Sequence, residues 1–433
     1  MSLNRRQLMT AGAGSALALT VPGVYRFRSA VAQETTVIRW WHITTNEDQA
    51  AQMQAAADAF VEANPDVEIE ITVQENEAFK ARLTTVMQSG DPPDVFQSWG
   101  GGVLYQYAEA GLVRDLTDAL AADGWGESFA QSGLALYGTG GRNYGVPWNI
   151  GMVGFWYSKA KFAEAGIEAV PATWADLLTT VQTLKDAGIV PIALGGGDKW
   201  PIHFYWVYLA IRNGGQAAFD AAYTREGSFA DPPFVKAGAD LLELSTLEPF
   251  QEGYLAATWP DSGVVYANGG AAMMLMGHWF PSGALDANLE DPAAMREDLE
   301  WFPFPSVDGG AGEPNDVLGG GNGFAVGANA PDAAVEFVKY LTSAEVQTEW
   351  AATGFAAPPA VVAANSAVTD PNLLPVMDYL AEAGYFQLYY DQFLPPAVGG
   401  VVNDESQALI AGAQTPEGMA ESIEASFAME SGG

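Results

Sequence analysis

The region from Thr36 to Gln97 alternates between short runs typical of β-strands and longer runs with helical spacing. The expected strands are 36–41, 67–73 and 94–97, and the expected helices are 47–64 and 77–89. Asn64-Pro65 ends the first helix, and Gly90-Asp91-Pro92-Pro93 ends the second. Strand, helix, strand, helix and strand in this order predict the α/β fold class with a parallel, doubly wound start to the sheet.

A second α/β unit is expected from about Tyr144 onward, because 433 residues are too many for one ordinary domain. We expect helices at 171–188, 203–212 and 332–350, and strands at 189–194, 271–279 and within the glycine-rich segment 318–328. Since α/β material recurs late in the sequence, the chain is expected to cross between the two units more than once.

The first 32 residues have the composition of an export signal. Arg5 and Arg6 precede an apolar run of small residues from Leu8 to Val24, and Ala30-Val31-Ala32 gives an A-x-A pattern. The arginine pair resembles the twin-arginine class of signals. The alternative is an uncleaved membrane anchor, for which the apolar run is short. We therefore expect residues 1–32 to direct export, and the protein to work in the periplasm or at the extracellular face of the membrane.

The charge and the absence of cysteine exclude several classes of function. The formal net charge of −35 repels phosphates and anionic lipids, which argues against nucleic-acid and membrane-surface partners. With no cysteine, disulfides, thiolate metal sites, cysteine nucleophiles and a lipid-modified cysteine anchor are all ruled out.

No catalytic motif supports an enzyme. The sequence has no G-x-S-x-G elbow and no H-E-x-x-H, and its three histidines (His42, His203 and His278) are too far apart for a local zinc motif. The glycine triplets at 100–102, 195–197 and 319–321 lack the Lys-Ser/Thr of a phosphate loop. Acidic residues are abundant, so a glycosidase-type carboxylate pair stays open as an alternative. We expect no enzyme activity, no cofactor and no metal.

Aromatic residues stand beside hydrogen-bonding residues where several expected strands end. The pairs or triplets are Trp41-His42, Gln97-Ser98-Trp99, Trp148-Asn149, Asp198-Lys199-Trp200, His278-Trp279 and Tyr390-Asp391-Gln392. Sugars offer apolar C–H faces on which an indole stacks, and hydroxyls that amide, carboxylate and imidazole groups bind. For each aromatic taken singly, core packing is the competing explanation. Their recurrence at strand ends favours a sugar site.

Trp40 and Trp41 end the first expected strand, and the alternation of a strand sends them to opposite faces. Open α/β sheets bind ligands beyond the carboxyl ends of their strands. We therefore expect Trp41 to be a stacking platform at a cleft and Trp40 to lie in the core.

At these residues the chain resembles the sugar-binding proteins of bacterial and archaeal ABC importers, the group that includes maltose-binding proteins. The segments that carry the resemblance are SGDPPDVFQSW (89–99), YGVPWN (144–149), GFWYSKAKFAEAGI (154–167), PATWADLL (171–178), GGAAMMLMGHW (269–279) and GGGNGFAV (319–326). The branch with glucose and short-oligosaccharide binders is the most similar.

The resemblance implies two α/β lobes joined by a hinge of crossing segments, which close over a ligand. It implies that residues 34–147 plus about 303–350 form lobe 1, and that 148–302 plus about 351–433 form lobe 2. The ligand-binding residues that we expect are Trp41, His42, Glu47, Gln97, Trp99, Asn149, Trp200, His278, Trp279, Asn322 and Asp391. The implied partners are a mono- or short oligosaccharide and the permease subunits of an importer, with the binding protein itself a monomer.

Three other functions stay open. Adjacent tyrosines, Tyr389-Tyr390, occur in iron-binding proteins of similar architecture, and acidic residues with aromatics would suit a polyamine. A secreted carbohydrate-active enzyme is the alternative from another class, and it would need two carboxylates across a cleft.

Overall fold

The computed structural model of this protein describes residues 35–285 and 292–432, and the expected export signal at 1–32 lies outside them. Residues from Thr36 onward form one compact unit. Within it the chain builds two α/β domains, each around its own five-stranded mixed sheet.

The first sheet has the strand order β2-β1-β3-β11-β6. Its strands are β1 (Thr36–His42), β2 (Val67–Val73), β3 (Val95–Ser98), β6 (Gly145–Pro147) and β11 (Gly323–Val326). β1 pairs in parallel with both β2 and β3, as the alternation of strands and helices over residues 36–97 predicts. β11 is antiparallel to β3 and β6.

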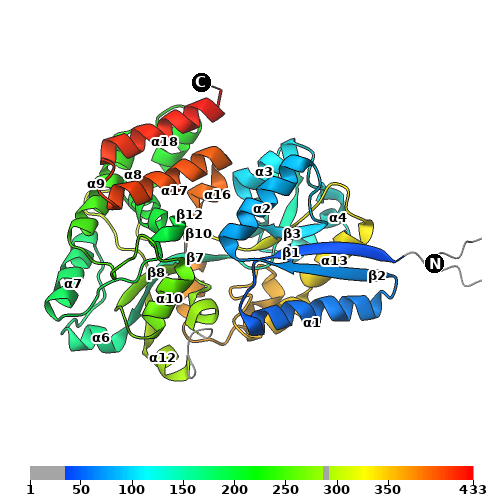
Figure 1. Cartoon of the computed structure of the whole chain (residues 1–433), viewed down its shortest axis with the longest axis horizontal. Helices are drawn as coiled ribbons and strands as arrows, with labels where there is room; N and C mark the ends of the chain where they lie inside the picture. The colour runs from blue at the N-terminus through cyan, green and yellow to red at the C-terminus, as the bar shows by residue number, and fades with distance from the viewer. Residues whose placement is uncertain (1–34, 286–291, 433) are drawn as a thin grey trace, which may run out of the picture. The chain divides into compact units, whose positions relative to one another are not determined.

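Helices cover both faces of this sheet. Apolar residues of α1 (Glu47–Ala63) and α13 (Asp332–Leu341) pack on one face, and those of α2 (Asn76–Ser89) and α3 (Gly101–Glu109) pack on the other (Figure 1). Trp40 lies in the first of these two cores and Trp41 in the second, as strand alternation requires. The smaller elements of this domain are α4 (Thr117–Ala121), η1 (Gly126–Ser128), α5 (Gln131–Ala135), β4 (Gly138–Thr139), β5 (Arg142–Asn143) and α14 (Ala344–Ala352).

The expected single helix at 332–350 is wrong, because the structure has two helices there. α13 ends at Leu341, and the hydroxyl of Ser343 accepts a hydrogen bond from the backbone N–H of Val346, 3.3 Å away. Ser343 is thus an N-cap, and this side chain starts a new helix inside a continuous apolar pattern.

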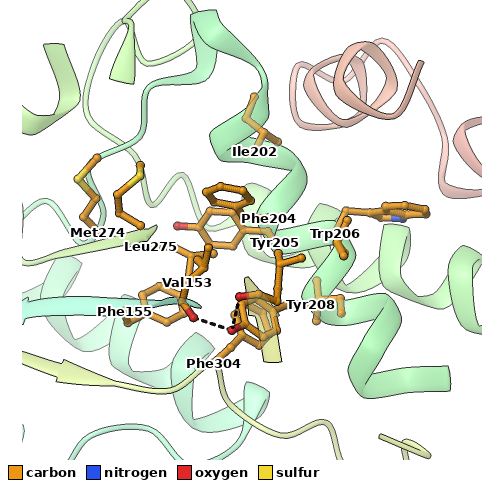
Figure 2. Packing of buried hydrophobic residues seen from close by; sticks show 14 of the residues in the cluster. Val153, Phe155, Ile202, Phe204, Tyr205, Trp206, Tyr208, Met274, Leu275 and Phe304 are labelled. Carbon is orange, nitrogen blue, oxygen red and sulfur yellow. Dashed lines mark hydrogen bonds between the residues drawn. The ribbon is translucent and has the colours of Figure 1, made fainter. Parts of the chain in front are cut away.

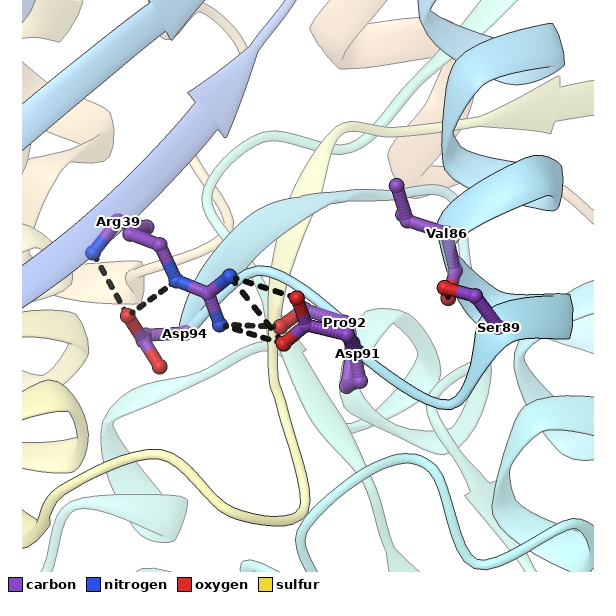
Figure 3. A network of polar contacts seen from close by, with 6 residues as sticks. All are labelled: Arg39, Val86, Ser89, Asp91, Pro92 and Asp94. Carbon is purple, nitrogen blue, oxygen red and sulfur yellow. Dashed lines mark hydrogen bonds and ion pairs between the residues drawn. The ribbon is translucent and has the colours of Figure 1, made fainter.

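The SGDPPD segment between α2 and β3 is held by Arg39 of β1 (Figure 3). The Asp94 carboxylate accepts hydrogen bonds from the backbone N–H and the Nε of Arg39, at 2.8 and 3.2 Å, and the guanidinium also donates to Pro92 O at 2.8 Å. Asp91 completes the network with an ion pair at 3.3 Å. These contacts fix the entry into β3, at the end of the strand away from the expected site.

The second sheet has the order β12-β10-β7-β8, and β9 also pairs with β7. Its strands are β7 (Gly151–Ser158), β8 (Met273–Gly277), β9 (Leu299–Phe302), β10 (Asp316–Gly320) and β12 (Tyr385–Leu388). β10 lies inside the range 303–350 expected for the first lobe but pairs with β7 and β12. The residue boundaries expected for the two lobes stay a prediction.

The expected strand at 189–194 does not form. Ile192 makes only isolated bridges to Phe250 and Met273. Pro191 lacks an N–H and interrupts a regular ladder at this point.

A long aromatic helix, α8 (Trp200–Tyr223), forms the centre of the second core. Figure 2 shows its packing on β7, where the Tyr208 hydroxyl donates to Val153 O at 2.5 Å and the Tyr208 ring stacks on Phe304 at 4.5 Å. The surrounding elements are α6 (Lys159–Glu164), α7 (Trp174–Asp186), η2 (Gly196–Asp198), α9 (Pro232–Thr246), α10 (Trp259–Ala267), η3 (Pro281–Leu285), α12 (Pro292–Asp298), η4 (Val362–Ala367), α15 (Leu374–Ala381), α16 (Tyr390–Phe393), α17 (Pro396–Ile410) and α18 (Pro416–Glu430).

Arg212 of α8 fixes the segment that leads into β10. Its guanidinium is buried and donates to five backbone carbonyls, those of Phe304, Pro305, Glu313, Pro314 and Asp316, at 2.7–3.1 Å. Burial lowers the pKa of Arg212. All five acceptors are neutral backbone carbonyls, and together they accept hydrogen bonds from each of the three guanidinium nitrogens of this buried cation.

The chain crosses between the two sheets at three neighbouring segments. Residues 148–150 join β6 to β7, residues 321–322 join β10 to β11, and the segment 355–360 runs beside them. The N–H of Trp148 donates to Asn322 O at 2.8 Å, and the N–H of Ile150 donates to Pro358 O at 3.0 Å. These hydrogen bonds tie the crossings into one hinge.

Candidate functional site

A cavity of about 320 Å³ lies where the three crossing segments meet. Both domains contribute to its walls. The lining residues are Ile43, Thr44, Thr45, Asn46, Gln49, Glu75, Asn76, Lys80, Trp99, Trp148, Asn149, Trp200, His203, Phe204, Trp259, Pro260, Trp279, Ser282, Gly283, Gly321, Asn322, Phe355, Tyr389, Asp391 and Gln392. Its size and its mixture of apolar and polar groups are typical of a small-molecule site between domains.

The floor of the cavity is built by the hinge itself. Asn149 Oδ1 accepts from the backbone N–H of Asn322 at 2.6 Å, and Asn322 Oδ1 accepts from Gln97 Nε2 at 2.7 Å. This chain of amide groups links two of the crossing segments, 148–150 and 321–322, to the end of β3. It therefore fixes two polar side chains at the bottom of the cavity.

The second domain supplies a wall of aromatic rings. Trp200 at the start of α8 lies 6.2 Å from Trp259 and 6.3 Å from Trp279, measured between ring centroids. Tyr389 lies 6.3 Å from Trp279 and 5.2 Å from Phe204. The rings are tilted or edge-on to one another, so they form a continuous apolar surface with indole faces turned in different directions.

The first domain supplies a mainly polar wall. The turn after β1 contributes Asn46, whose side chain caps α1 by accepting from the N–H of Gln49 at 3.1 Å. Lys80 of α2 forms an ion pair with Glu77 at 2.9 Å, and its ammonium lies 5.5 Å from the centre of the Trp99 ring. Gln49 reaches across the cavity and donates to Ser282 O at 3.2 Å, a direct contact between the two domains.

Asp391, His203 and Asn403 form a buried polar group in the second domain. The Nδ1 of His203 lies 2.8 Å from Asn403 Oδ1, and its Nε2 lies 3.9 Å from Asp391 Oδ1. Burial lowers the pKa of His203, although the Asp391 charge acts in the opposite direction. A neutral imidazole leaves the Asp391 carboxylate free to accept hydrogen bonds from a ligand in the cavity.

Several polar atoms at the cavity have no partner within the described part of the chain. They are Trp148 Nε1, Trp200 Nε1, His203 Nε2 and the Tyr389 hydroxyl. A buried polar group without a partner costs free energy, so these four atoms leave the cavity wall with polar groups that are not fully satisfied.

The structure brings six of the expected binding residues to the cavity and places five elsewhere. Those that line it are Trp99, Asn149, Trp200, Trp279, Asn322 and Asp391. Those that do not are Trp41, His42, Glu47, Gln97 and His278.

The five displaced residues have identifiable positions. Trp41 packs in the core under α2, with the Arg82 guanidinium 4.2 Å from its ring, so it is no cleft platform. His42 lies 4.8 Å from the Trp40 ring and accepts from the N–H of Thr44. Glu47 is exposed in the first turn of α1, where its charge suits the helix dipole. Gln97 serves the hinge as described above.

His278 is buried beside Gly151, whose missing side chain leaves room for the imidazole. Burial lowers its pKa to about 3. This histidine is therefore neutral, and it contributes to the core behind Trp279 rather than to the cavity.

Sequence reasoning missed part of the aromatic wall and most of the polar one. Trp259 stands in T-W-P-D, where Thr258 and Asp261 form a capping box, so its sequence signal is that of a helix start. Trp148 belongs to the aromatic–polar pair Trp148-Asn149 of the sequence analysis, but only Asn149 of that pair was among the expected binding residues. Nothing in the sequence around Lys80 or Gln49 distinguishes them from ordinary exposed helix residues.

Among residues 35–285 and 292–432, no group of three or more His, Asp or Glu side chains is placed to hold a metal ion. Over the same residues, none of the helices has the length and apolar character needed to cross a membrane.

Comparison with known proteins identifies the family. The family model of bacterial extracellular solute-binding proteins matches residues 44–348. The diacetylchitobiose-binding protein of Streptomyces coelicolor is 28% identical over 287 residues, which cover 65% of this chain and 64% of that relative. The multiple sugar-binding protein of Streptococcus mutans is 25% identical over 323 residues, or 71% of this chain and 72% of the relative. The match thus spans just under two thirds of the first relative and somewhat more of the second.

Solved structures share the fold over nearly the whole chain. One from work on xylan utilization by Caldanaerobius polysaccharolyticus has a TM-score of 0.83 and 26% identity, and the match covers 90% of this chain and 99% of that one. A chitin oligosaccharide binding protein has a TM-score of 0.85 and 24% identity, with 92% and 100% covered. The chain belongs to the family of bacterial extracellular solute-binding proteins.

Proposed function

We propose that this protein captures a sugar outside the cytoplasm and delivers it to the permease subunits of an ABC importer. The observation that carries the proposal is the cavity between the domains, with its wall of Trp200, Trp259 and Trp279 facing amide and carboxylate side chains. An indole face and a set of polar groups on opposite sides match the two kinds of surface on a pyranose ring. The names of relatives that bind diacetylchitobiose or multiple sugars support the same class of ligand.

The proposed mechanism is closure of the two domains about the hinge. A ligand held by both walls gains contacts only when the domains are together, so it stabilises the closed form by its differential affinity for that form. Permease subunits would then recognise the closed protein. We propose a monomer that is exported through its twin-arginine signal and leaves its ligand chemically unchanged.

The ferric-iron alternative is disfavoured by the surroundings of its two tyrosines. Tyr390 packs against Trp206 and Phe219, whereas Tyr389 packs against Phe204 and Trp279. Burial raises the pKa of both phenols well above the ordinary value. Ferric iron binds phenolate, and this burial opposes the loss of the phenol proton.

A thermal-shift screen of the protein tests the proposal. The panel contains glucose, xylose, galactose, trehalose, short gluco-, xylo- and chito-oligosaccharides, spermidine and Fe(III). A ligand that binds only the folded state raises the melting temperature, and we expect such a rise with at least one saccharide. A rise with spermidine or Fe(III) alone would overturn the sugar assignment.

A further inference from the structure

A second cavity, of about 230 Å³, adjoins the first. It lies between α2 and α3 of the first domain and α16 and α17 of the second. Four residues line both cavities: Lys80, Trp99, Asp391 and Gln392. A molecule seated in the first cavity therefore meets the entrance of the second at these shared side chains.

We infer that the binding site continues past Trp99 into this second cavity, and that its ligand is a linear oligosaccharide rather than a monosaccharide. The inference rests on the proposed function and names the class of sugar that the site takes. The second cavity is similar in volume to the first, at about 230 against 320 Å³, so each has room for a unit of the same kind.

The second cavity, like the first, is lined by both apolar and polar side chains. Its apolar residues include Phe96 and Leu104, and its polar residues include Thr84 and Asn403. Gln97 also lines it, while its Nε2 donates to Asn322 Oδ1 at the floor of the first cavity, 2.7 Å away. One amide side chain thus connects the floor of the first cavity with the wall of the second.

Asp391 has a position that suits a ligand crossing from one cavity to the other. It lines both cavities, and its side chain is 8% exposed. Its polar contacts on the second-domain side are Asn403 Nδ2 at 3.4 Å and His203 Nε2 at 3.9 Å, both long for hydrogen bonds. The carboxylate therefore keeps capacity to accept from sugar hydroxyls at the junction.

Gly400 of α17 offers a way to close the second cavity selectively. It lines that cavity and not the first, and a Cβ built on it meets no atom within 4 Å. The neighbouring Gly399 has no such space, because a Cβ there would lie 2.7 Å from Asp391 Cα. Gly400→Phe therefore adds bulk beside the second cavity without a clash at its Cβ, and replacing a helical glycine does not weaken α17.

Titration calorimetry over three length series tests the inference: xylose to xylotetraose, glucose to cellotetraose, and N-acetylglucosamine to its tetramer. For the series that binds, we expect affinity to rise by at least about tenfold from the monomer to the trimer. Gly400→Phe should remove most of this gain and leave the affinity for the shortest bound member unchanged. Ala397→Phe is the matched control, because Ala397 is exposed on the same helix and lines neither cavity.

Two results would overturn the inference in distinguishable ways. Equal affinity for monomer and trimer in the wild-type protein would overturn the oligosaccharide assignment and leave sugar capture intact, and this comparison needs no variant. A length gain that survives in Gly400→Phe would overturn the place assigned to the extra units. Binding of galactose or trehalose alone would also overturn the oligosaccharide assignment, whereas absence of binding by every saccharide of the three series and of the thermal-shift panel would overturn the proposed function, and the inference with it.

Discussion

Trp279 is the residue that we expect to contribute most of the stacking on a bound saccharide. Its ring is half-buried at the cavity, next to Trp200 and Tyr389. Trp279→Ala should weaken saccharide binding by about 1–3 kcal/mol, as aromatic truncation does at other binding surfaces. Titration calorimetry measures the change.

Trp41 provides the control for that experiment. It lies in the core under α2 and does not line the cavity. Trp41→Phe keeps an aromatic ring in place and should leave the affinity unchanged. If Trp41→Phe lost as much saccharide affinity as Trp279→Ala, the result would support the predicted role of Trp41 as a stacking platform. It would contradict the assignment of stacking to the aromatic wall of the second domain.

His278 should make stability depend on pH. Burial lowers its pKa from 6.5 to about 3, so between these values the unfolded chain binds a proton that the folded protein does not. Stability that is present above pH 6.5 is therefore lost as the pH falls toward about 3. The melting temperature of His278→Gln, compared with that of the wild type at pH 7.5 and pH 5, isolates this group from the many carboxylates.

The expected outcome is that the wild-type advantage over His278→Gln shrinks at the lower pH. An advantage that is equal at both pH values would show that the histidine does not titrate in this way.

At the scale of elements, Arg212 joins α8 to the segment that leads into β10. Its five backbone acceptors come from residues 304–316, and among the described residues the Phe304 and Pro305 carbonyls have no other hydrogen-bond donor. Arg212→Met should cost about 3–5 kcal/mol of unfolding free energy, because it leaves buried acceptors unsatisfied. Urea denaturation measures this cost, and a loss below about 1 kcal/mol would contradict the role given to Arg212.

The amino-terminal end of α3 packs on α16 across the two domains, and glycine makes this possible. A Cβ at Gly102 would lie 2.6 Å from Phe393 O and 2.7 Å from Leu394 O. Gly102→Ala should therefore keep the domains slightly apart and weaken saccharide binding by about tenfold, since ligand affinity falls with the population of the closed form. Calorimetry measures the affinity, and small-angle scattering measures the separation of the domains.

Gly400→Ala is the matched control for Gly102→Ala, because its added methyl meets no atom within 4 Å. It should bind the shortest saccharide of the series as the wild type does. Wild-type affinity in Gly102→Ala would show that this glycine contact does not limit closure.

The elements themselves were largely predictable. The strands and helices of 36–98 follow the sequence pattern closely, because apolar periodicity and the breakers Asn64-Pro65 and Gly90 act locally. The failures at 189–194 and 332–350 come from a proline inside an apolar run and from a serine cap inside a helical pattern. Both are single-residue effects that override a longer periodic signal.

At the scale of the whole molecule, the site was predictable only in part. Trp99, Trp200 and Trp279 stand beside polar residues at strand or helix ends, and they line the cavity together. The positions of Trp41 and His42 could not be read from sequence, because the face of β1 that meets the ligand depends on where α2 and the second domain pack. Gln49 and Lys80 line the cavity because of where α1 and α2 lie in the fold. The sequence around each residue does not indicate that position.

The central claim is that the cavity between the domains binds a saccharide and does not transform it. The most direct measurement is a calorimetric titration of the protein with the saccharide that gives the largest thermal shift. We expect a single-site isotherm that saturates at one ligand per chain, with heat flow returning to baseline after each injection. Sustained heat flow from turnover, or no binding heat with any saccharide of the panel, would contradict it.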